Sequence, residues 1–260
     1  MNDFPFKNQL RPGLVLLLLF SPLLTSAADI PIIAAAASVK FALQDISQAF
    51  HQDTGKTVRI SYSSSGNLTR QIKQGAPFEL FLSANTSYVV QLYQQQKTLD
   101  QGVVYALGRL ALLSSKNSPL LLDEHLHGLK QALQKGQLQH FAIANPEHAP
   151  YGVAARELLQ QLGLWELVQP NLVLGENAAQ AAQFASSGAA QVGLISYSLA
   201  LAPALHKHTR FLLLPAALHQ PLQQTMVLLN NAGDTAKLFF NYLQQDKART
   251  ILSRYGYTTP

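Results

Sequence analysis

The chain has 260 residues, with 19 Lys and Arg against 14 Asp and Glu, a formal net charge of +5 and no cysteine. The lack of cysteine excludes disulfides, thiolate catalysis, thiolate metal sites and a lipid-anchored cysteine. The small basic excess is spread along the chain without a basic run, so the composition does not indicate a nucleic-acid partner.

The N-terminal residues predict an export signal. Lys7 and Arg11 form a positively charged region, an apolar core begins at residues 14–20, and small residues at 25–27 provide a cleavage point. The apolar core is shorter than the roughly 20 residues that span a bilayer. We therefore predict a signal peptide over residues 1–27 and a periplasmic location for the remainder.

The next part of the chain alternates strands and helices. Residues 29–34 (DIPIIA) predict a buried strand, and apolar residues between 39 and 50 predict one face of a helix. Residues 58–63 predict a second strand, which turns through three serines into an amphipathic segment carrying Leu68 and Ile72. A strand over 79–83 and a helix over 86–95 follow. This alternation favours a parallel α/β sheet, in which ligands bind beyond the carboxyl ends of the strands.

The remainder of the chain continues the pattern. Strands are expected at 109–115, 140–145 and 192–197, and the last helices at 234–244 and 247–254. A rigid turn over 145–152 leads into a helix after Tyr151. Asn177 is a good N-cap for the next helix, which leaves the amides of Ala178 and Ala179 free to donate.

Two serines stand at predicted helix starts. Ser38 occupies an N-cap position, so its hydroxyl either caps its own helix, a role whose loss costs about 1 kcal/mol, or turns outward to a ligand. Ser65 lies in the turn SSSGN, which contains no Lys or Arg. A helix start presents amide N–H groups without partners and partial positive charge, and so favours an anion. A ligand held here would meet neutral donors only.

Seven segments together resemble the periplasmic molybdate-binding proteins of ATP-driven importers, in the family's order. They are AAASVKFALQDI (35–46), SSSGNLTRQIKQGAP (63–77), LFLSAN (80–85), NPEHAPYGVAARELL (145–159), GENAAQAAQF (175–184), VGLISYS (192–198) and RYGY (254–257). The resemblance implies a two-lobed α/β periplasmic binding protein of type 2, each lobe a mostly parallel sheet flanked by helices, with the ligand cleft between them. It implies that residues 28–108 and 209–260 form lobe 1 and residues 109–208 form lobe 2.

The resemblance also implies a function and a site. The expected function is capture of molybdate or tungstate by a monomeric, non-enzymatic protein that needs no cofactor and delivers the anion to the membrane permease of an ABC importer. The implied ligands act without a metal cation: Ser38 and Ser65 through hydroxyl and backbone N–H groups, and Tyr151 and Ala178 mainly through backbone N–H groups. Further candidates are Ser64, if the turn is shifted by one residue, with Asn177 and Tyr197. Tyr197 stands one place later than the tyrosine of some members, and a one-residue shift on a strand reverses its facing direction.

Three other interpretations remain open. The first is a two-lobed binder of another tetrahedral oxyanion, such as sulfate or thiosulfate. The second is a serine hydrolase, although the sequence contains no G-x-S-x-G motif around Ser65 or Ser196. The third is a metal site at the pair His125 and His127 or the pair His206 and His208, which surface exposure explains better because no carboxylate cluster lies nearby.

Overall fold

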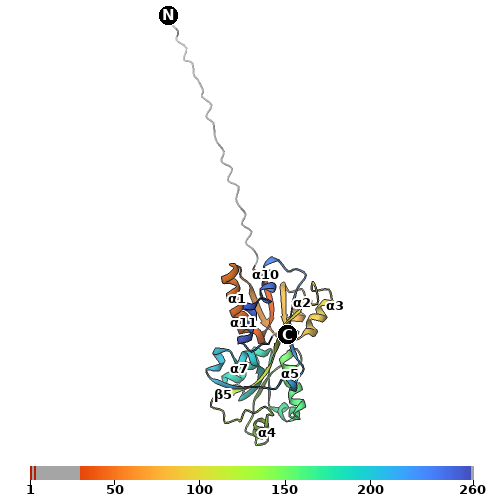
Figure 1. Cartoon of the computed structure of the whole chain (residues 1–260), viewed down its shortest axis with the longest axis vertical. Helices are drawn as coiled ribbons and strands as arrows, with labels where there is room; N and C mark the ends of the chain where they lie inside the picture. The colour runs from red at the N-terminus through yellow and green to blue at the C-terminus, as the bar shows by residue number, and fades with distance from the viewer. Residues whose placement is uncertain (2, 4–29, 259–260) are drawn as a thin grey trace.

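The computed structural model describes residues 1, 3 and 30–258, so the predicted signal peptide lies outside the described residues apart from two positions. The chain forms two halves, each built on a five-stranded sheet flanked by helices (Figure 1). The predicted two-lobed α/β fold is confirmed. Among the helices of residues 30–258, none has the length and apolar character needed to cross a bilayer.

The first half contains a sheet with the strand order β2-β1-β3-β10-β4. β1 is parallel to β2 and β3, whereas β10 returns from the end of the chain and runs antiparallel to β3 and β4. The strands are β1 (Ile32–Ala36), β2 (Arg59–Ser63), β3 (Phe78–Ser83), β4 (Val103–Gly108) and β10 (Leu222–Leu228). The helices are η1 (Ala37–Val39), α1 (Lys40–Thr54), α2 (Ser65–Lys73), α3 (Thr86–Gln94), α10 (Asp234–Tyr242) and α11 (Asp246–Arg254).

The second half repeats this arrangement with the order β7-β6-β8-β5-β9. β6 is parallel to β7 and β8, and β5 is antiparallel to β8 and β9. The strands are β5 (Leu110–Ser115), β6 (Phe141–Ala144), β7 (Leu172–Gly175), β8 (Val192–Ser196) and β9 (Thr209–Leu213). The helices are α4 (His127–Gln134), α5 (Pro150–Gln161), α6 (Trp165–Val168), η2 (Gln169–Asn171), α7 (Ala178–Ser187), α8 (Tyr197–Ala200), α9 (Pro203–His206) and η3 (Ala216–Leu218).

Two neighbouring crossovers join the halves. The first is the step from β4 to β5 through Arg109, and the second comprises residues 214–221 between β9 and β10. The Arg109 guanidinium donates to the carbonyl of Leu214 at 2.7 Å, which ties one crossover to the other. The return was expected at residue 209, but β9 pairs with β5 along its whole length and belongs to the second sheet. An apolar strand pattern does not specify which of two sheets the strand joins, so the expected boundary was several residues too early.

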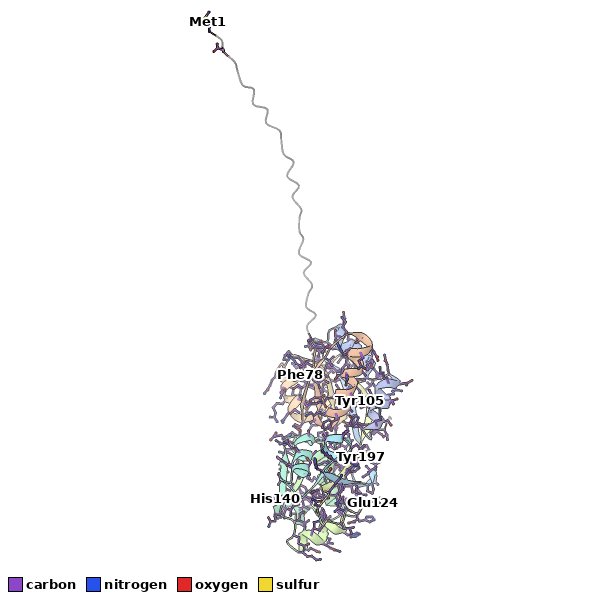
Figure 2. All side chains as sticks on the ribbon, turned by 90° about the vertical axis from the view of Figure 1, so that its left-hand side faces the viewer. Met1, Phe78, Tyr105, Glu124, His140 and Tyr197 are labelled. Carbon is purple, nitrogen blue, oxygen red and sulfur yellow. The ribbon has the colours of Figure 1, made fainter. Side chains whose placement is uncertain are left out.

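Each half has its own apolar core. In the first half, α1, α10 and α11 cover one face of the sheet, and α2 and α3 cover the other. The second half buries one continuous cluster around β5, β6 and β8. Figure 2 shows the side chains gathered into two stacked bodies, with Phe78 and Tyr105 in one and His140 and Glu124 in the other. Most apolar residues thus pack within their own half, while Ala36, Ala84 and Leu222 of the first half join the cluster of the second.

Phe50 joins the beginning of the first half to its end. Its ring is fully buried and makes edge-to-face contacts with Phe239 at 5.0 Å and Tyr242 at 5.4 Å between ring centroids. We expect Phe50→Ala to lower the free energy of unfolding by about 3–5 kcal/mol, because it leaves a cavity between α1 and α10. Urea unfolding followed by circular dichroism measures this loss.

Leu238→Ala is the matched control, because Leu238 lies on α10 next to Phe239 but is 42% exposed. Its effect should stay within about 0.5 kcal/mol. Equal losses in the two variants would contradict the assignment of Phe50 to the core contact.

Candidate functional site

A small cavity lies between the two halves, beyond the carboxyl ends of strands in both sheets. Its volume is about 10 Å³, roughly the room for one water molecule, and is far below the range of about 300–1,000 Å³ typical of pockets for organic ligands. No charged side chain is among the described residues that line it. The first half contributes Ala36, Ala37, Ser38, Ser63, Ser64, Ser65 and Ala84, and the second contributes Ala149, Pro150, Tyr151 and Ala178.

The start of α2 brings Ser65 to the cavity. Ser64 caps the helix, because its side chain accepts from the Asn67 N–H at 3.3 Å. The Gly66 N–H donates to the carbonyl of His148 in the other half at 2.9 Å, and Leu68 bonds to the carbonyl of Ser64. Within the described residues, Ser65 is thus the position in this first turn whose N–H has no protein acceptor.

The starts of α5 and α7 follow the same pattern. In α5, Pro150 has no N–H, and the amides of Gly152 and Val153 donate to Ala149, so the Tyr151 N–H is left over. In α7, Asn177 Oδ1 accepts from the amides of Ala179 and Gln180 at 3.0 and 3.1 Å. This leaves the Ala178 N–H without an acceptor in the described part of the chain.

Two serine residues with hydroxyl groups line the same cavity. Ser65 Oγ accepts from the Ala84 N–H at 3.0 Å, so its own proton remains available to donate. Ser38 Oγ is buried and has no hydrogen-bond partner among the described residues. A buried polar group left unpaired costs about 1–3 kcal/mol, so this hydroxyl indicates a missing acceptor. Tyr151 Oη is also buried, and it packs against Gly108, which does not line the cavity.

Burial keeps the Tyr151 hydroxyl neutral. Desolvation raises the pKa of this group well above its usual range, and the nearby Tyr257 hydroxyl adds to the shift. The hydroxyl therefore retains its proton at physiological pH and remains a donor. It also packs so closely against Gly108 that a β-carbon at that position would collide with it.

The structure places the four principal candidate residues around one cavity. Ser38, Ser65, Tyr151 and Ala178 all line it, and they come from four different turns, two in each half. Ser38 does not cap its own helix: it lies within η1, and its side chain makes no capping bond. The capping alternative left open for Ser38 is therefore excluded.

The three additional candidates have other roles. Ser64 lines the cavity, but its hydroxyl is engaged with Asn67 and His148. Asn177 is an N-cap as predicted, yet the expectation that it would leave the Ala179 amide free is wrong, because Asn177 Oδ1 itself accepts from that amide. Tyr197 opens α8 away from the cavity, with its ring 5.8 Å from that of Phe211.

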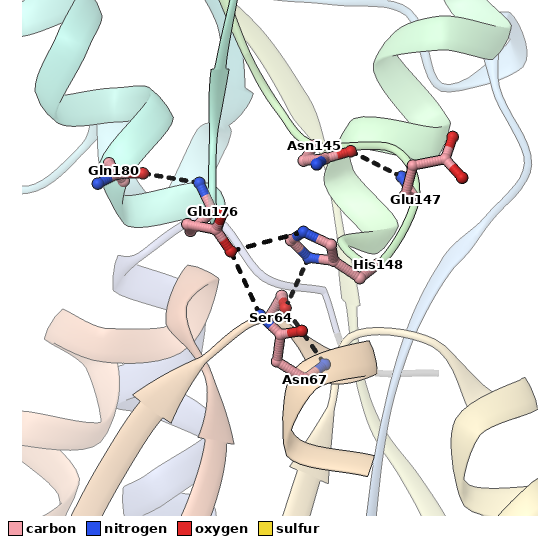
Figure 3. A network of polar contacts seen from close by, with 7 residues as sticks. All are labelled: Ser64, Asn67, Asn145, Glu147, His148, Glu176 and Gln180. Atoms are coloured by element: carbon pink, nitrogen blue, oxygen red, sulfur yellow. Dashed lines mark hydrogen bonds and ion pairs between the residues drawn. The ribbon is translucent and has the colours of Figure 1, made fainter. Parts of the chain in front are cut away.

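Polar contacts close the two halves over the cavity (Figure 3). His148 Nδ1 lies 2.9 Å from Ser64 Oγ, and its Nε2 lies 3.6 Å from Glu176 Oε2. Asn67 Nδ2 donates across the gap to the same carboxylate oxygen at 3.4 Å. The sequence predicts only that His148 belongs to the turn over residues 145–152. The local pattern carries no signal of the contact with Ser64, which is distant in the chain.

Ser64, His148 and Glu176 have the composition of a hydrolase triad, but their environment does not suit one. Ser64 is only 3% exposed, and its oxygen already accepts a capping bond. The Glu176 side chain is 67% exposed and lies beyond hydrogen-bond distance of the imidazole. Little empty space adjoins Ser64 for a substrate carbonyl, so this set fits a contact between the halves better than a nucleophile.

The histidine pairs do not assemble a cation site. The rings of His125 and His127 lie 5.6 Å apart, and His127 pairs with Asp123 at 3.3 Å. His206 packs its ring against Phe211. In the part of the chain that the structure describes, no group of three or more His, Cys, Asp or Glu residues could hold a metal ion.

Comparison with known proteins identifies the family of this chain. Residues 32–258 match the family of bacterial extracellular solute-binding proteins. The molybdate-binding protein ModA of Rhodobacter capsulatus is 36% identical over the full length of both chains, and that of Azotobacter vinelandii is 34% identical over 89% of this chain and 90% of its own.

Solved structures give the same result. The periplasmic molybdate-binding protein of Azotobacter vinelandii superposes with a TM-score of 0.80 at 28% identity, covering 88% of this chain and 99% of its own. The sulfate-binding protein SubI of Mycobacterium tuberculosis shares the fold, with a TM-score of 0.70 at 15% identity over 88% of this chain and 86% of its own. The chain belongs to the bacterial extracellular solute-binding proteins.

Proposed function

We propose that this protein captures molybdate, and also tungstate, outside the cytoplasm and delivers it to the membrane permease of an ABC importer. The observation that carries the proposal is the set of unclaimed donors around one cavity: the amides of three helix starts and the hydroxyls of Ser38 and Ser65. The 34–36% identity to molybdate-binding relatives supports the choice of anion. The predicted signal peptide over residues 1–27 supports a periplasmic location, and the protein is proposed to act as a monomer.

We propose that the anion is held by Ser38, Ser65, Tyr151 and Ala178. Ser65 offers an amide and a hydroxyl, Ser38 offers a hydroxyl, and Tyr151 and Ala178 each offer an amide. A tetrahedral dianion presents only acceptors, so a site made entirely of donors suits it. Hydrogen bonds to an ionised group are roughly twice as strong as neutral ones, which allows a dianion to be held without a cationic side chain.

The same donor set would suit sulfate or thiosulfate, because donor count does not separate one tetrahedral dianion from another. Selectivity then depends on how well the anion fills the cavity. Phosphate differs, since its protonated form at neutral pH would bring a donor, and a serine hydroxyl of the site would have to accept from it instead of donating. Titration with each anion in turn decides among them.

Calorimetric titration of the mature chain tests the function directly. Molybdate and tungstate should each bind with one-to-one stoichiometry, and sulfate and phosphate should give little heat at the same concentrations. Sulfate binding as tight as molybdate binding would replace the proposed function with that of a sulfate binder. Absence of binding by all four anions would remove the oxyanion function altogether.

Removing single hydroxyls tests the proposed site. We expect Ser38→Ala and Ser65→Ala each to weaken molybdate binding by about 10- to 100-fold, because a hydrogen bond to a charged group contributes about 1.5–3 kcal/mol. Calorimetry gives the dissociation constants. Ser47→Ala is the control, because Ser47 bonds within α1 and does not line the cavity. Unchanged affinity in both site variants would exclude this cavity as the binding site.

Gly66 tests whether binding requires the halves to close. A β-carbon at Gly66 would lie 2.8 Å from the carbonyl oxygen of His148 in the other half. Gly66→Ala should therefore hinder closure and weaken molybdate binding at least tenfold. It should leave the melting temperature of the ligand-free protein unchanged or slightly raised, because alanine favours a helix by about 1 kcal/mol over glycine.

The matched control places alanine at Gln71, which is exposed on the same helix and does not line the cavity. Gln71→Ala should bind molybdate normally. Wild-type affinity in Gly66→Ala would contradict a closed form with this contact.

A further inference from the structure

His148 contacts the other half of the molecule through two of its atoms. Its carbonyl oxygen accepts from the Gly66 N–H at 2.9 Å, and its Nδ1 lies 2.9 Å from Ser64 Oγ. Its Nε2 faces Glu176 Oε2 at 3.6 Å, and this carboxylate accepts from Asn67 in the first half (Figure 3). None of the side chains of His148, Glu176 and Asn67 lines the cavity.

We propose that His148 is a positioning residue that latches the two halves together and thereby sets the rate at which the bound anion leaves. The proposal rests on the proposed function and adds a residue to it. His148 would act through the geometry of the closed form, without touching the anion. Because its contacts with Ser64 and Gly66 join the two halves, they exist only when the halves are closed.

The chain holds the latch in a fixed position. Asn145 accepts hydrogen bonds from Glu147 through its side chain and from Ala149 through its carbonyl, so the turn that carries His148 is rigid. The Glu176 N–H donates to Gln180 Oε1 at 2.7 Å, which fixes the backbone of the facing carboxylate. The turn that carries the imidazole and the backbone of the facing carboxylate are thus both held by hydrogen bonds.

The contact between His148 and Ser64 can form with a donor on one side. Ser64 Oγ already accepts from the Asn67 N–H, and its single proton is free to donate to His148 Nδ1. With this arrangement His148 Nδ1 acts as an acceptor, and Nε2 remains on the side of Glu176.

The position of the latch in the chain couples it to the anion site. Ser64 directly precedes Ser65, and His148 lies three residues before Tyr151. A bond between Ser64 and His148 therefore holds the starts of α2 and α5, which carry two of the proposed ligands, at a fixed separation. A ligand that touches both halves is released only after they part, so a latch slows dissociation more than it changes association.

The two side-chain contacts are unequal. The His148 side chain is 14% exposed, so its bond to Ser64 is shielded from water, whereas Glu176 is 67% exposed. Exposed ion pairs contribute little, and the carboxylate contact should therefore be the weaker of the two. Among the described residues, the acidic side chain that lies within 4 Å of the imidazole is that of Glu176.

Exchange of radiolabelled molybdate for an unlabelled excess measures the dissociation rate from the mature chain. We expect His148→Ala to raise this rate about five- to tenfold, as for the loss of one shielded hydrogen bond, and to change the association rate less than about twofold. The melting temperature of the ligand-free protein should not change, because under this proposal the two halves lie apart in that state.

Graded variants distinguish a latch from a general structural role. His148→Asn should restore most of the slow release, because its amide reaches the Nδ1 position, whereas Glu176→Gln should raise the rate about twofold at most. Glu147→Ala is the control, because Glu147 belongs to the same turn but pairs with Arg156 at 3.8 Å within its own half.

Each outcome decides one question. Wild-type release from His148→Ala overturns the latch and leaves the proposed function intact. A fall in the melting temperature of the ligand-free variant that matches its loss of affinity assigns His148 a structural role and also overturns the latch. A wild-type chain that binds no molybdate defeats the proposed function, and the latch with it.

Discussion

The amides at the starts of α2, α5 and α7 impose the main physical constraint on this molecule. Each helix start leaves one buried N–H without an acceptor, at Ser65, Tyr151 and Ala178, and all three line one cavity. The buried hydroxyl of Ser38 beside them also has no hydrogen-bond partner among the described residues. Unpaired buried donors are costly, and a bound anion would satisfy all of them at once. The cavity therefore suits a ligand that offers several hydrogen-bond acceptors.

Topology and capping together produce this arrangement. Parallel neighbouring strands in each sheet end at the same edge, so the helix starts that follow them gather there. Ser64 and Asn177 then satisfy the deeper amides of their own helices, and proline removes one donor from α5. What remains at each start is a single amide that points into the cavity. Within residues 30–258, the site carries no charged side chain because backbone amides provide the donors that lysine or arginine would otherwise supply.

Local pattern predicted much of this structure, and contacts between distant residues account for what it missed. Apolar periodicity and the serine turn placed the helix starts, and the family resemblance selected Ser38, Ser65, Tyr151 and Ala178. The pattern could not assign Thr209–Leu213 to the second sheet, because strand pairing is a long-range property. It also could not show that Asn177 occupies the Ala179 amide, or that His148 meets Ser64 from 84 positions away. These facts depend on how the two halves meet.

The most direct test of a neutral site shared by both halves is a crystal structure of the molybdate-bound protein with anomalous scattering measured at the molybdenum edge. We expect one strong peak per chain inside the cavity, with the oxygens around it within hydrogen-bond distance of Ser65 Oγ and the Ala178 amide. A peak beside a lysine or arginine on the surface, or one bound by a single half, would contradict a site made of uncharged donors from both halves.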